Sequence, residues 1–314
     1  MTQKNTLIVV AGPTAVGKTS FSIALAKHLQ TEVVSADSRQ FYKETVIGTA
    51  APTIEEMDGV KHHFVGHLSI KDYYNVFMYE QDAINVLHKL FQKHNYVILT
   101  GGSGLYIDSV CEGIDELPDA DPVLRERLKQ QLEDEGIESL LNQLLILDEP
   151  YYWIVDKKNP KRILRALEVC LQTGKTYTSL RTQSQKQRNF DILKICLTLP
   201  REQLCERINL RTEKMMRNGF LQEAISLFPY KHLNALNTVG YKELFDYMEG
   251  KTSLDIAVEK IKTNTRRYAK RQMTWFKGKG DYRFFEPQSH FCLNDDTSAT
   301  LSINFCDFDD CLMV

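Results

Sequence analysis

Apolar runs of strand length alternate with segments of helical periodicity along most of the chain. The runs that predict buried strands lie at 7–11, 32–35, 96–100 and 192–199. The segments that predict helices lie at 19–29, 79–94, 201–218 and 253–277. Strands that alternate with helices in this way are typical of an α/β fold with a parallel sheet. A loop is predicted at 48–65, where Pro52 and Gly59 interrupt both patterns.

Between about residues 116 and 188 the alternation stops and the pattern is helical throughout. Asp121-Pro122 predicts the start of one helix, because Asp caps helix N-termini and proline is favoured at the first helical position. Asn159-Pro160 predicts the start of another helix, which is expected to end at Gly174. We therefore predict an all-helical insertion domain at 116–188.

This insertion divides the α/β core into two parts, 1–115 and 189–287. The residues that remain, 288–314, have no counterpart in the core and are expected to form a poorly ordered acidic tail. From Glu286 to the end there are six acids and no Lys or Arg, although the whole chain carries a net charge of only −2. The rest of the chain therefore holds 39 basic against 35 acidic side chains, a net charge of +4. A mildly basic body with clustered cations is compatible with a nucleic-acid partner.

The seven cysteines are dispersed and include no CxxC pair, which is typical of a reduced, cytoplasmic protein. No apolar run approaches the ~20 residues that a membrane span needs. Residues 1–5 lead directly into the first predicted strand, so no signal peptide is expected.

A glycine-rich loop, GPTAVGKT (12–19), lies between the first predicted strand and the first predicted helix. This order is the context that a phosphate-binding P-loop requires, because successive backbone N–H groups then meet at a helix N-terminus. Gly12 and Gly17 allow close approach of a ligand, Lys18 supplies a positive charge, and the Thr19 hydroxyl is placed to bind Mg²⁺. The alternative is a chance match in an ordinary β-turn-α unit.

Two other predicted strands end in residues with possible chemistry. Asp37 follows the strand 32–35 and would lie at the edge of the sheet where ligands bind, although it could also be a turn or cap residue. The strand 96–100 ends in Gly101-Gly102-Ser103-Gly104, without the acid that many P-loop NTPases carry there. This turn permits close backbone approach and offers the Ser103 hydroxyl, or it is simply a strand-to-helix turn.

Basic residues gather in two helical segments. Five cations lie near the helix start at Asn159-Pro160, where they oppose the helix dipole, and this placement favours contact with an anion over a merely solvated face. The segment 266–277 has five cations, no acid and three aromatic residues. This combination suits phosphate contact and base stacking, whereas the alternative is core aromatics beside a solvated basic edge.

With these motifs in sequence, the chain resembles the tRNA dimethylallyltransferases, also called tRNA isopentenyltransferases. The resemblance extends from Leu7 to about Phe285 and is carried by seven motifs in one order: GPTAVGKT (12–19), SADSRQFY (35–42), IGTAAPT (47–53), GGSGLYI (101–107), PKRILRALEV (160–169), NTVGYKE (237–243) and AKRQMTWFKG (269–278). It implies a P-loop NTPase-like core with a parallel sheet and a helical insertion.

The resemblance also implies a reaction, the transfer of a dimethylallyl group from dimethylallyl diphosphate to N6 of the adenine immediately 3′ of the anticodon. The P-loop would then hold the diphosphate leaving group rather than a nucleoside triphosphate, with Mg²⁺ as cofactor. Ionising the C–O bond builds negative charge on the diphosphate, which suits the loop amides, Lys18 and Mg²⁺ at Thr19. Adenine N6 is a weak nucleophile, so a carboxylate that accepts its proton suits Asp37.

Matched to the family, the catalytic residues would be Asp37, Lys18 and Ser103, the last where the family usually has Thr. The diphosphate would be bound by Gly12, Thr14, Ala15, Val16, Gly17, Lys18, Thr19 and Arg211. The tRNA anticodon stem-loop would be contacted by Asp37, Ser38, Arg39, Gln40, Ser103, Arg125, Lys161, Arg162, Ile163, Leu164, Arg165, Asn237, Thr238, Val239, Gly240, Tyr241, Lys242, Lys270, Arg271, Gln272, Trp275 and Lys277. We expect a monomer that does not associate with membranes.

The chain departs from the family pattern at Ala51, where the family usually has Lys, at Arg39, and in its acidic tail. The Ala51 change affects only an auxiliary phosphate contact. Two other functions compete with prenyl transfer. A P-loop kinase needs the same loop but would favour an Asp where Gly101 stands, and a non-enzymatic RNA-binding module would leave Lys18 and Asp37 without a role.

Overall fold

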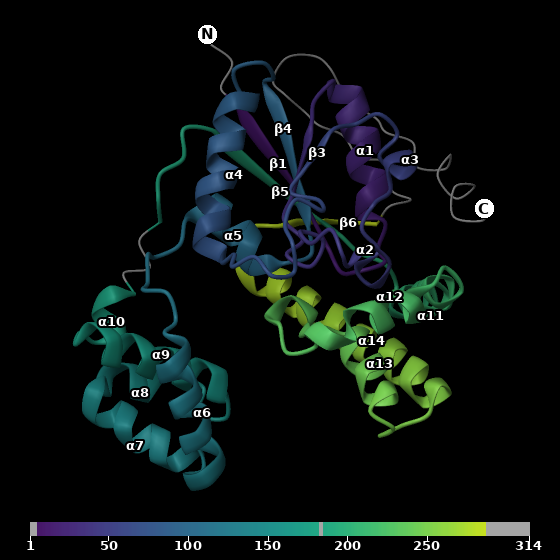
Figure 1. Cartoon of the computed structure of the whole chain (residues 1–314). Helices are drawn as coiled ribbons and strands as arrows, with labels where there is room; N and C mark the ends of the chain where they lie inside the picture. The colour runs from purple at the N-terminus through teal and green to yellow at the C-terminus, as the bar shows by residue number, and fades with distance from the viewer. Residues whose placement is uncertain (1–4, 182–184, 287–314) are drawn as a thin grey trace. The chain divides into compact units, whose positions relative to one another are not determined.

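The fold is described by a computed structural model, in which residues 5–181 and 185–286 are placed (Figure 1). The chain divides into two compact units. The first comprises residues up to 111 and from 188 onward, and the second comprises residues 112–187. The helical insertion expected at 116–188 corresponds to the second unit, which begins at 112. The tail expected at 288–314 lies outside the described residues.

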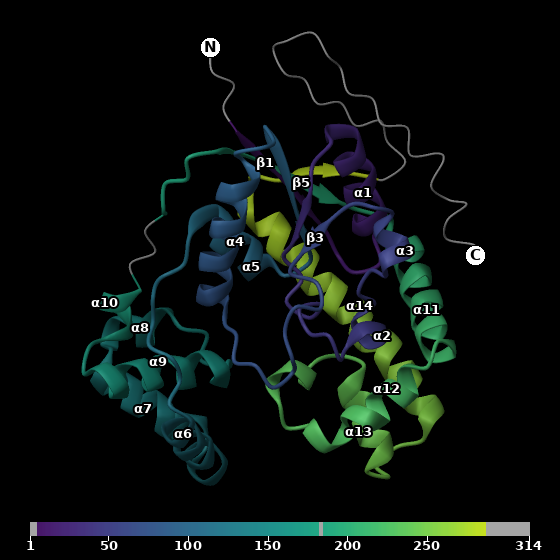
Figure 2. The same ribbon diagram turned by 45° about the horizontal axis from the view of Figure 1, so that its top comes forward.

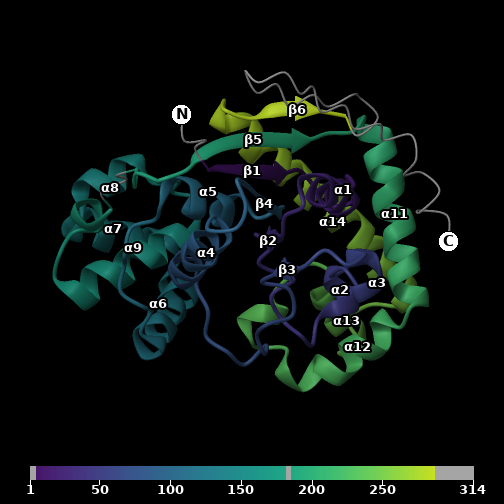
Figure 3. The ribbon, with the colours of Figure 1, turned by 90° about the horizontal axis from the view of Figure 1, so that it is seen from above.

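The described part of the first unit contains a six-stranded sheet in the order β3-β2-β4-β1-β5-β6, and all of its strand pairs are parallel (Figure 3). The strands are β1 (Thr6–Ala11), β2 (Val33–Ser35), β3 (His62–His63), β4 (Tyr96–Gly101), β5 (Asp191–Leu197) and β6 (Arg283–Phe285). Leu7 to Ala11 are fully buried, as expected for a central parallel strand covered on both faces. This is the α/β fold with a parallel sheet that the alternation predicts.

The helices of the first unit cover both faces of the sheet. They are α1 (Lys18–Leu29), α2 (Val46–Thr49), α3 (Ile54–Met57), α4 (Val76–Leu90), α5 (Gly104–Glu112), α11 (Arg201–Arg217), α12 (Phe220–Leu227), α13 (Tyr241–Met248) and α14 (Leu254–Lys279). Ile8 and Val10 face α1, whereas Leu7 and Val9 belong to the cluster that contains α4, α5 and α14. Helix α14 extends from the sheet to α11 and α13, so it connects the sheet with the C-terminal helices (Figure 2).

The second unit contains α6 (Pro122–Glu135), α7 (Ile137–Leu147), α8 (Glu149–Ile154), α9 (Pro160–Thr173) and α10 (Tyr177–Leu180). Its core is mainly aliphatic, with Leu140, Leu144 and Leu167 fully buried. The predicted caps are confirmed. Asp121 accepts hydrogen bonds from two backbone N–H groups of α6, Asn159 accepts one from α9, and Gly174 ends α9 in the left-handed conformation.

The prediction of a loop at 48–65 is wrong in part, because this segment contains α3 and β3. Thr53 and Glu56 form a reciprocal capping box that starts α3, and β3 pairs with β2 at the sheet edge. Strand β6 was not predicted either, because its three residues are too few for a periodic pattern. No helix in the described part of the chain is both long and apolar enough to cross a membrane.

Candidate active site

The GPTAVGKT loop follows β1 and leads into α1 at the carboxyl edge of the sheet. Gly12 and Gly17 have φ of 151° and 104°, which favour glycine, and a Cβ at Gly12 would lie 2.8 Å from the Leu197 carbonyl oxygen. Helix α1 has no side-chain cap and no acid in its first turn. Its N-terminal N–H groups are therefore suited to bind an anion.

Lys18 lies half-buried at the start of α1, and its Nζ donates a hydrogen bond to the Pro13 carbonyl at 2.9 Å. Burial lowers the pKa of Lys18 to about 8; the Asp37 carboxylate opposes this shift and the Arg211 guanidinium adds to it. Burial thus makes the charged form of Lys18 less favourable. An anion that binds beside Lys18 stabilises that charged form.

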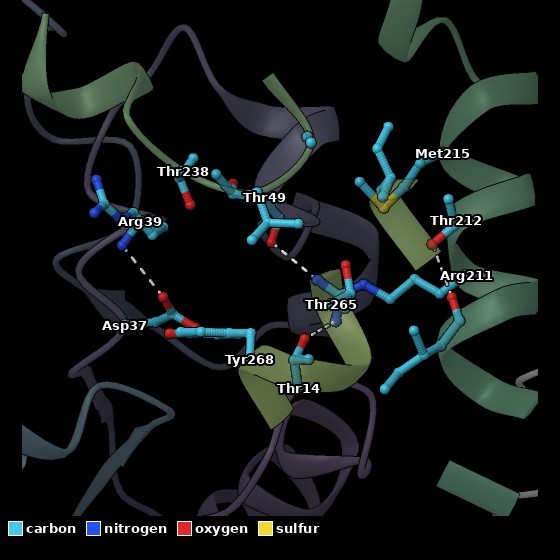
Figure 4. Close-up of a pocket in the computed structure, with 15 residues that line it drawn as sticks. Thr14, Asp37, Arg39, Thr49, Arg211, Thr212, Met215, Thr238, Thr265 and Tyr268 are labelled. Atoms are coloured by element: carbon cyan, nitrogen blue, oxygen red, sulfur yellow. Dashed lines mark hydrogen bonds between the residues drawn. The ribbon is translucent and has the colours of Figure 1, made fainter. Parts of the chain in front are cut away.

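Thr14 connects the loop to two helices. Its N–H donates to Gln272 Oε1 on α14 at 2.9 Å, and its hydroxyl accepts from Arg211 on α11 at 3.1 Å. Arg211 also donates to the Thr49 carbonyl at 3.0 Å. The guanidinium thus lies between Thr14 of the GPTAVGKT loop and Thr49 at the end of α2, as Figure 4 shows.

These groups border a cleft that is open to solvent. The predicted site residues that line it are Thr14, Asp37, Arg39, Arg211, Thr238, Val239 and Gly240. Asp37 and the Tyr268 ring lie side by side, with the Arg211 guanidinium and Thr14 nearby (Figure 4). A single cleft therefore holds a cationic end, suited to phosphate, and a carboxylate.

Tyr268, Thr265 and Thr49 also line this cleft but were missed in the sequence. Helical spacing could have identified the first two, because Ile261, Thr265 and Tyr268 recur at intervals of four and three on one face of α14. Burial raises the pKa of Tyr268 to about 12, and Asp37 adds to this shift. The phenol therefore stays protonated beside the carboxylate at neutral pH.

The segment after β2 is held by its own hydrogen bonds. Asp37 Oδ1 accepts from the Arg39 N–H at 3.2 Å, and Ser103 Oγ accepts from the Ser38 N–H at 3.1 Å. The Arg39 guanidinium donates to the carbonyls of Asn234 and Ala235 at 3.1 and 3.4 Å. Ser103 and Arg39 thus hold the Asp37 loop against its neighbours.

Gln40 was expected to contact tRNA, but its amide donates to the carbonyls of Thr49 and Ala50 at 3.3 and 3.1 Å. Ala51 follows this turn and is only 8% exposed, with its N–H donated to the Val46 carbonyl. The contacts of Gln40 therefore stabilise one wall of the cleft.

The glycines of the turn that follows β4 leave room for neighbouring groups of the protein. A Cβ at Gly101 would lie 2.5 Å from the carbonyl carbon and oxygen of Ala36. A Cβ at Gly102 would overlap the Gln272 amide, and one at Gly104 would overlap the Trp275 ring. No side chain fits at Gly101, so the strand-end acid of many P-loop NTPases has no room here.

Tyr241, expected at the tRNA surface, is fully buried. Its hydroxyl donates to Glu223 Oε1 at 2.6 Å, and the same carboxylate accepts from the N–H groups of Ile47 and Gly48, each at 2.8 Å. Burial and then the Glu223 carboxylate raise the pKa of Tyr241. Its side chain therefore supports the α2 wall of the cleft, whereas Asn237 and Lys242 nearby are exposed.

Helix α14 presents exposed cations beside the cleft, namely Lys270, Arg271 and Lys277. Trp275 is 40% exposed, and its indole N–H donates to Asp108 at 3.1 Å. The Arg271 guanidinium lies 5.8 Å from the centre of the Tyr268 ring. Gln272, in contrast, is buried between the loops.

The sequence model of the IPP transferase family matches residues 40–279. A tRNA dimethylallyltransferase of Bacteroides thetaiotaomicron is 54% identical over 283 residues, which cover 90% of this chain and 92% of that protein. The chain belongs to the IPP transferase family. A relative of the same name from Christiangramia forsetii is 51% identical and covers 90% of this chain and 93% of its own length.

Solved structures of IPP transferase relatives agree with the fold. The tRNA isopentenylpyrophosphate transferase of Bacillus halodurans superposes with a TM-score of 0.65 at 35% identity and covers 90% of each chain. A eukaryotic dimethylallyltransferase, described as acting on tRNA, gives a TM-score of 0.72 at 27% identity over 90% of this chain and 74% of that one.

In the second unit, the IPP transferase motif PKRILRALEV forms most of α9. Lys161 and Arg162 are exposed, Leu164 is half-buried, and Ile163 is fully buried in the core of the unit. The Ile163 side chain cannot reach a ligand while it packs there. The expected contact of this residue with tRNA stays a prediction for its backbone alone.

Two arginines of this unit are engaged by Glu168, which is 1% exposed. Arg125 donates to both carboxylate oxygens, at 2.5 and 2.7 Å. Arg165 donates to Glu168 at 3.4 Å and to the Pro118 carbonyl at 2.7 Å. Contacts of these two residues with tRNA stay predictions, and Lys161 and Arg162 are the exposed cations of the motif.

A resident metal centre would need several acidic, His or Cys ligands. The described residues contain no group of three or more such side chains that could hold a metal ion. Thr19 is exposed at the start of α1, where its hydroxyl is accessible to a bound ligand. This donor set fits a Mg²⁺ that is held mainly by phosphate oxygens and water.

Proposed function

We propose that this protein transfers a dimethylallyl group from dimethylallyl diphosphate to N6 of the adenine 3′-adjacent to the anticodon in tRNA, with release of diphosphate. The observation that carries this proposal is the single cleft that holds Thr14 and Arg211 together with Asp37. The names of the relatives support it, since they are called tRNA dimethylallyltransferases.

The diphosphate would bind to the loop amides at the start of α1, with Lys18 and Arg211 beside it. As the bond between C1 and oxygen breaks, the electron pair leaves with the diphosphate, and negative charge grows on its oxygens. Cations and N–H groups that are already in place stabilise this charge more than they stabilise the bound substrate. A Mg²⁺ at Thr19 would supply further charge stabilisation to the diphosphate when it is bound.

Asp37 would act at the other side of the reacting carbon. The new bond forms between C1 and adenine N6, and N6 then carries a positive charge and must lose a proton. Asp37 would accept that proton. The neutral phenol of Tyr268 flanks the same carboxylate (Figure 4). The adenine would have to leave the stack of the anticodon loop to reach this position.

The tRNA would be held mainly by exposed cations, among them Lys270, Arg271 and Lys277 on α14 and Lys161 and Arg162 on α9. Such side chains contact phosphates without reading sequence, so they position the loop rather than choose it.

The proposal is tested by mass spectrometry of an anticodon stem-loop incubated with the protein, Mg²⁺ and dimethylallyl diphosphate. The expected product is one dimethylallyl group heavier, with the added mass on the adenine that follows the anticodon. An unchanged RNA would exclude the proposed function, and consumption of ATP with phosphorylation of a small molecule would favour a kinase. A stem-loop with guanosine in place of that adenine is the matched control and should stay unmodified.

A further inference from the structure

We propose that Gln272 is a positioning residue that fixes the phosphate-binding loop to α14. Through it, the helix that carries the exposed cations and the loop that binds the diphosphate are held as one unit. The inference rests on the proposed function only for the identity of the ligand, an allylic diphosphate.

The first support is the hydrogen bonding of the side chain. Gln272 is only 6% exposed, its Oε1 accepts from the Thr14 N–H at 2.9 Å, and its Nε2 donates to the Gly102 carbonyl at 2.8 Å. A backbone N–H can only donate and a carbonyl can only accept, so the orientation of the amide is determined. Each end of the side chain therefore holds a different loop of the catalytic edge.

The second support is the shape of the Gly101–Gly104 turn. A Cβ at Gly102 would overlap the Gln272 amide, and one at Gly104 would overlap the ring of Trp275, three residues further along α14. The space left by these glycines is thus filled by α14 and not by a ligand. Helix α14 therefore packs directly against this turn.

The third support is the position of Thr14. Its N–H is held by Gln272 and its hydroxyl by Arg211, so the loop is fixed from α14 and from α11 at the same residue. Without Gln272 the Thr14 N–H would lose its partner, and the loop would gain further conformations. In these conformations Lys18 and Arg211 would not both contact the same ligand. Binding would then have to order the loop, which weakens affinity.

The exposed cations Lys270 and Arg271 take no part in these hydrogen bonds, which join Gln272 to Thr14 and Gly102. Loss of Gln272 should therefore weaken diphosphate binding and leave tRNA binding unchanged. A side chain that only stabilised the fold would lower both in proportion to the fraction of folded protein.

The experiment compares Gln272→Met, which keeps the side-chain volume and loses both hydrogen bonds, with Gln81→Met, the same change at an exposed position of α4. Calorimetric titration with pyrophosphate and Mg²⁺ should give a Kd raised about tenfold for Gln272→Met, as expected for a buried donor left unpaired. Filter binding of the anticodon stem-loop should match that of Gln81→Met. An unchanged pyrophosphate Kd, or an equal loss for RNA, would overturn the proposal.

A second variant tests the same hydrogen bonds from the other side. Gly102→Ala displaces the Gln272 amide without changing the residue itself, and Gly278→Ala is the control, because a Cβ there meets nothing within 4 Å. Gly102→Ala should raise the pyrophosphate Kd as Gln272→Met does. The double variant should bind pyrophosphate no more weakly than either single variant, since both changes disrupt the same attachment of Gln272 to the two loops. Additive losses would overturn the proposal.

Pyrophosphate binding is measured without turnover. A protein whose pyrophosphate Kd depends on Gln272 but which does not modify RNA would refute the proposed function alone. An active enzyme with an unchanged pyrophosphate Kd in both variants would refute the role of Gln272 alone.

Discussion

Arg211 donates a hydrogen bond to the hydroxyl of Thr14 at 3.1 Å, which joins α11 to the phosphate-binding loop. The second terminal nitrogen of the Arg211 guanidinium donates to the Thr49 carbonyl at 3.0 Å. A planar guanidinium can make both contacts in one orientation, whereas an ammonium is a point charge without that fork. The pairing of Arg211 with Thr14 and Thr49 therefore depends on the shape of the side chain as well as on its charge.

Arg211→Lys should raise the KM for dimethylallyl diphosphate about tenfold, because it keeps the charge and loses the fork that holds Thr14 and Thr49. The matched variant is Arg217→Lys at the exposed end of α11, which should behave as wild type. Steady-state kinetics with saturating stem-loop measures the difference. If Arg211→Lys kept the wild-type KM, Arg211 would not face the diphosphate.

The lowered pKa of Lys18 predicts a pH dependence. Lys18 is charged below its folded pKa of about 8 and neutral above it, so pyrophosphate affinity should fall as the pH rises through about 8. Lys18→Arg should abolish this fall, because the guanidinium stays protonated. Calorimetric titrations from about pH 7 to about pH 9.5 in one buffer series test it. A parallel fall in both proteins would assign the effect to another group.

The same shift affects stability in a defined pH window. The folded pKa of about 8 lies below the ordinary lysine value of 10.5, so the unfolded chain binds the Lys18 proton more tightly than the folded chain does. Stability from this group should therefore rise between about pH 8 and pH 10.5 and be constant below that window. Lys18→Met should remove this rise in denaturant titrations. A rise that persists would exclude Lys18 as its source.

Asp37→Asn should lower the single-turnover rate by ~10²–10⁴, the usual contribution of a general base. The amide keeps the shape and one acceptor oxygen, so the hydrogen bond from the Arg39 N–H is retained and both substrates should bind as in wild type. Rapid-quench experiments with saturating stem-loop measure the rate. A rate within about threefold of wild type would mean that Asp37 is structural.

Charge removal on α14 should flatten the salt dependence of RNA binding. Arg267 and Arg271 are exposed and four residues apart, and the slope should decrease by roughly one unit for every phosphate that the helix no longer neutralises. The double variant Arg267→Gln, Arg271→Gln is compared with Lys89→Gln, Lys93→Gln, which removes two exposed cations of the same unit. Equal slopes in the two double variants would remove α14 from the interface.

Local patterns in the sequence predicted the elements whose causes are local. The apolar run at Leu7–Ala11, the Asp121 cap and the Gly174 stop each depend on neighbours a few residues away, and each was predicted correctly. The strand, glycine loop and helix around GPTAVGKT belong to this group, because they are contiguous, whereas phosphate binding by the loop stays a prediction. The nearness of Asp37 follows from the rule that parallel strands end at one edge.

Long-range pairs could not be predicted in this way. Tyr241 carries no sign that its hydroxyl meets Glu223, and Gln272 carries none that it reaches Thr14 across 258 residues of sequence. Both were expected at the RNA surface and are buried. Ile163 differs, because helical spacing alone places it on the apolar side of α9, and its expected tRNA contact came only from the motif match.

The parallel pairing of β1 with β5 determines when the enzyme can act during its own synthesis. Thr6 pairs with Asp191, so a ribosome that adds about 5–20 residues per second completes the whole second unit before β1 acquires this neighbour. Gln272 and Trp275 are synthesised later still, and both pack against the turn after β4. A nascent chain therefore carries the GPTAVGKT loop long before Gln272 and Trp275 are synthesised, and its carboxyl sheet edge stays incomplete until they are.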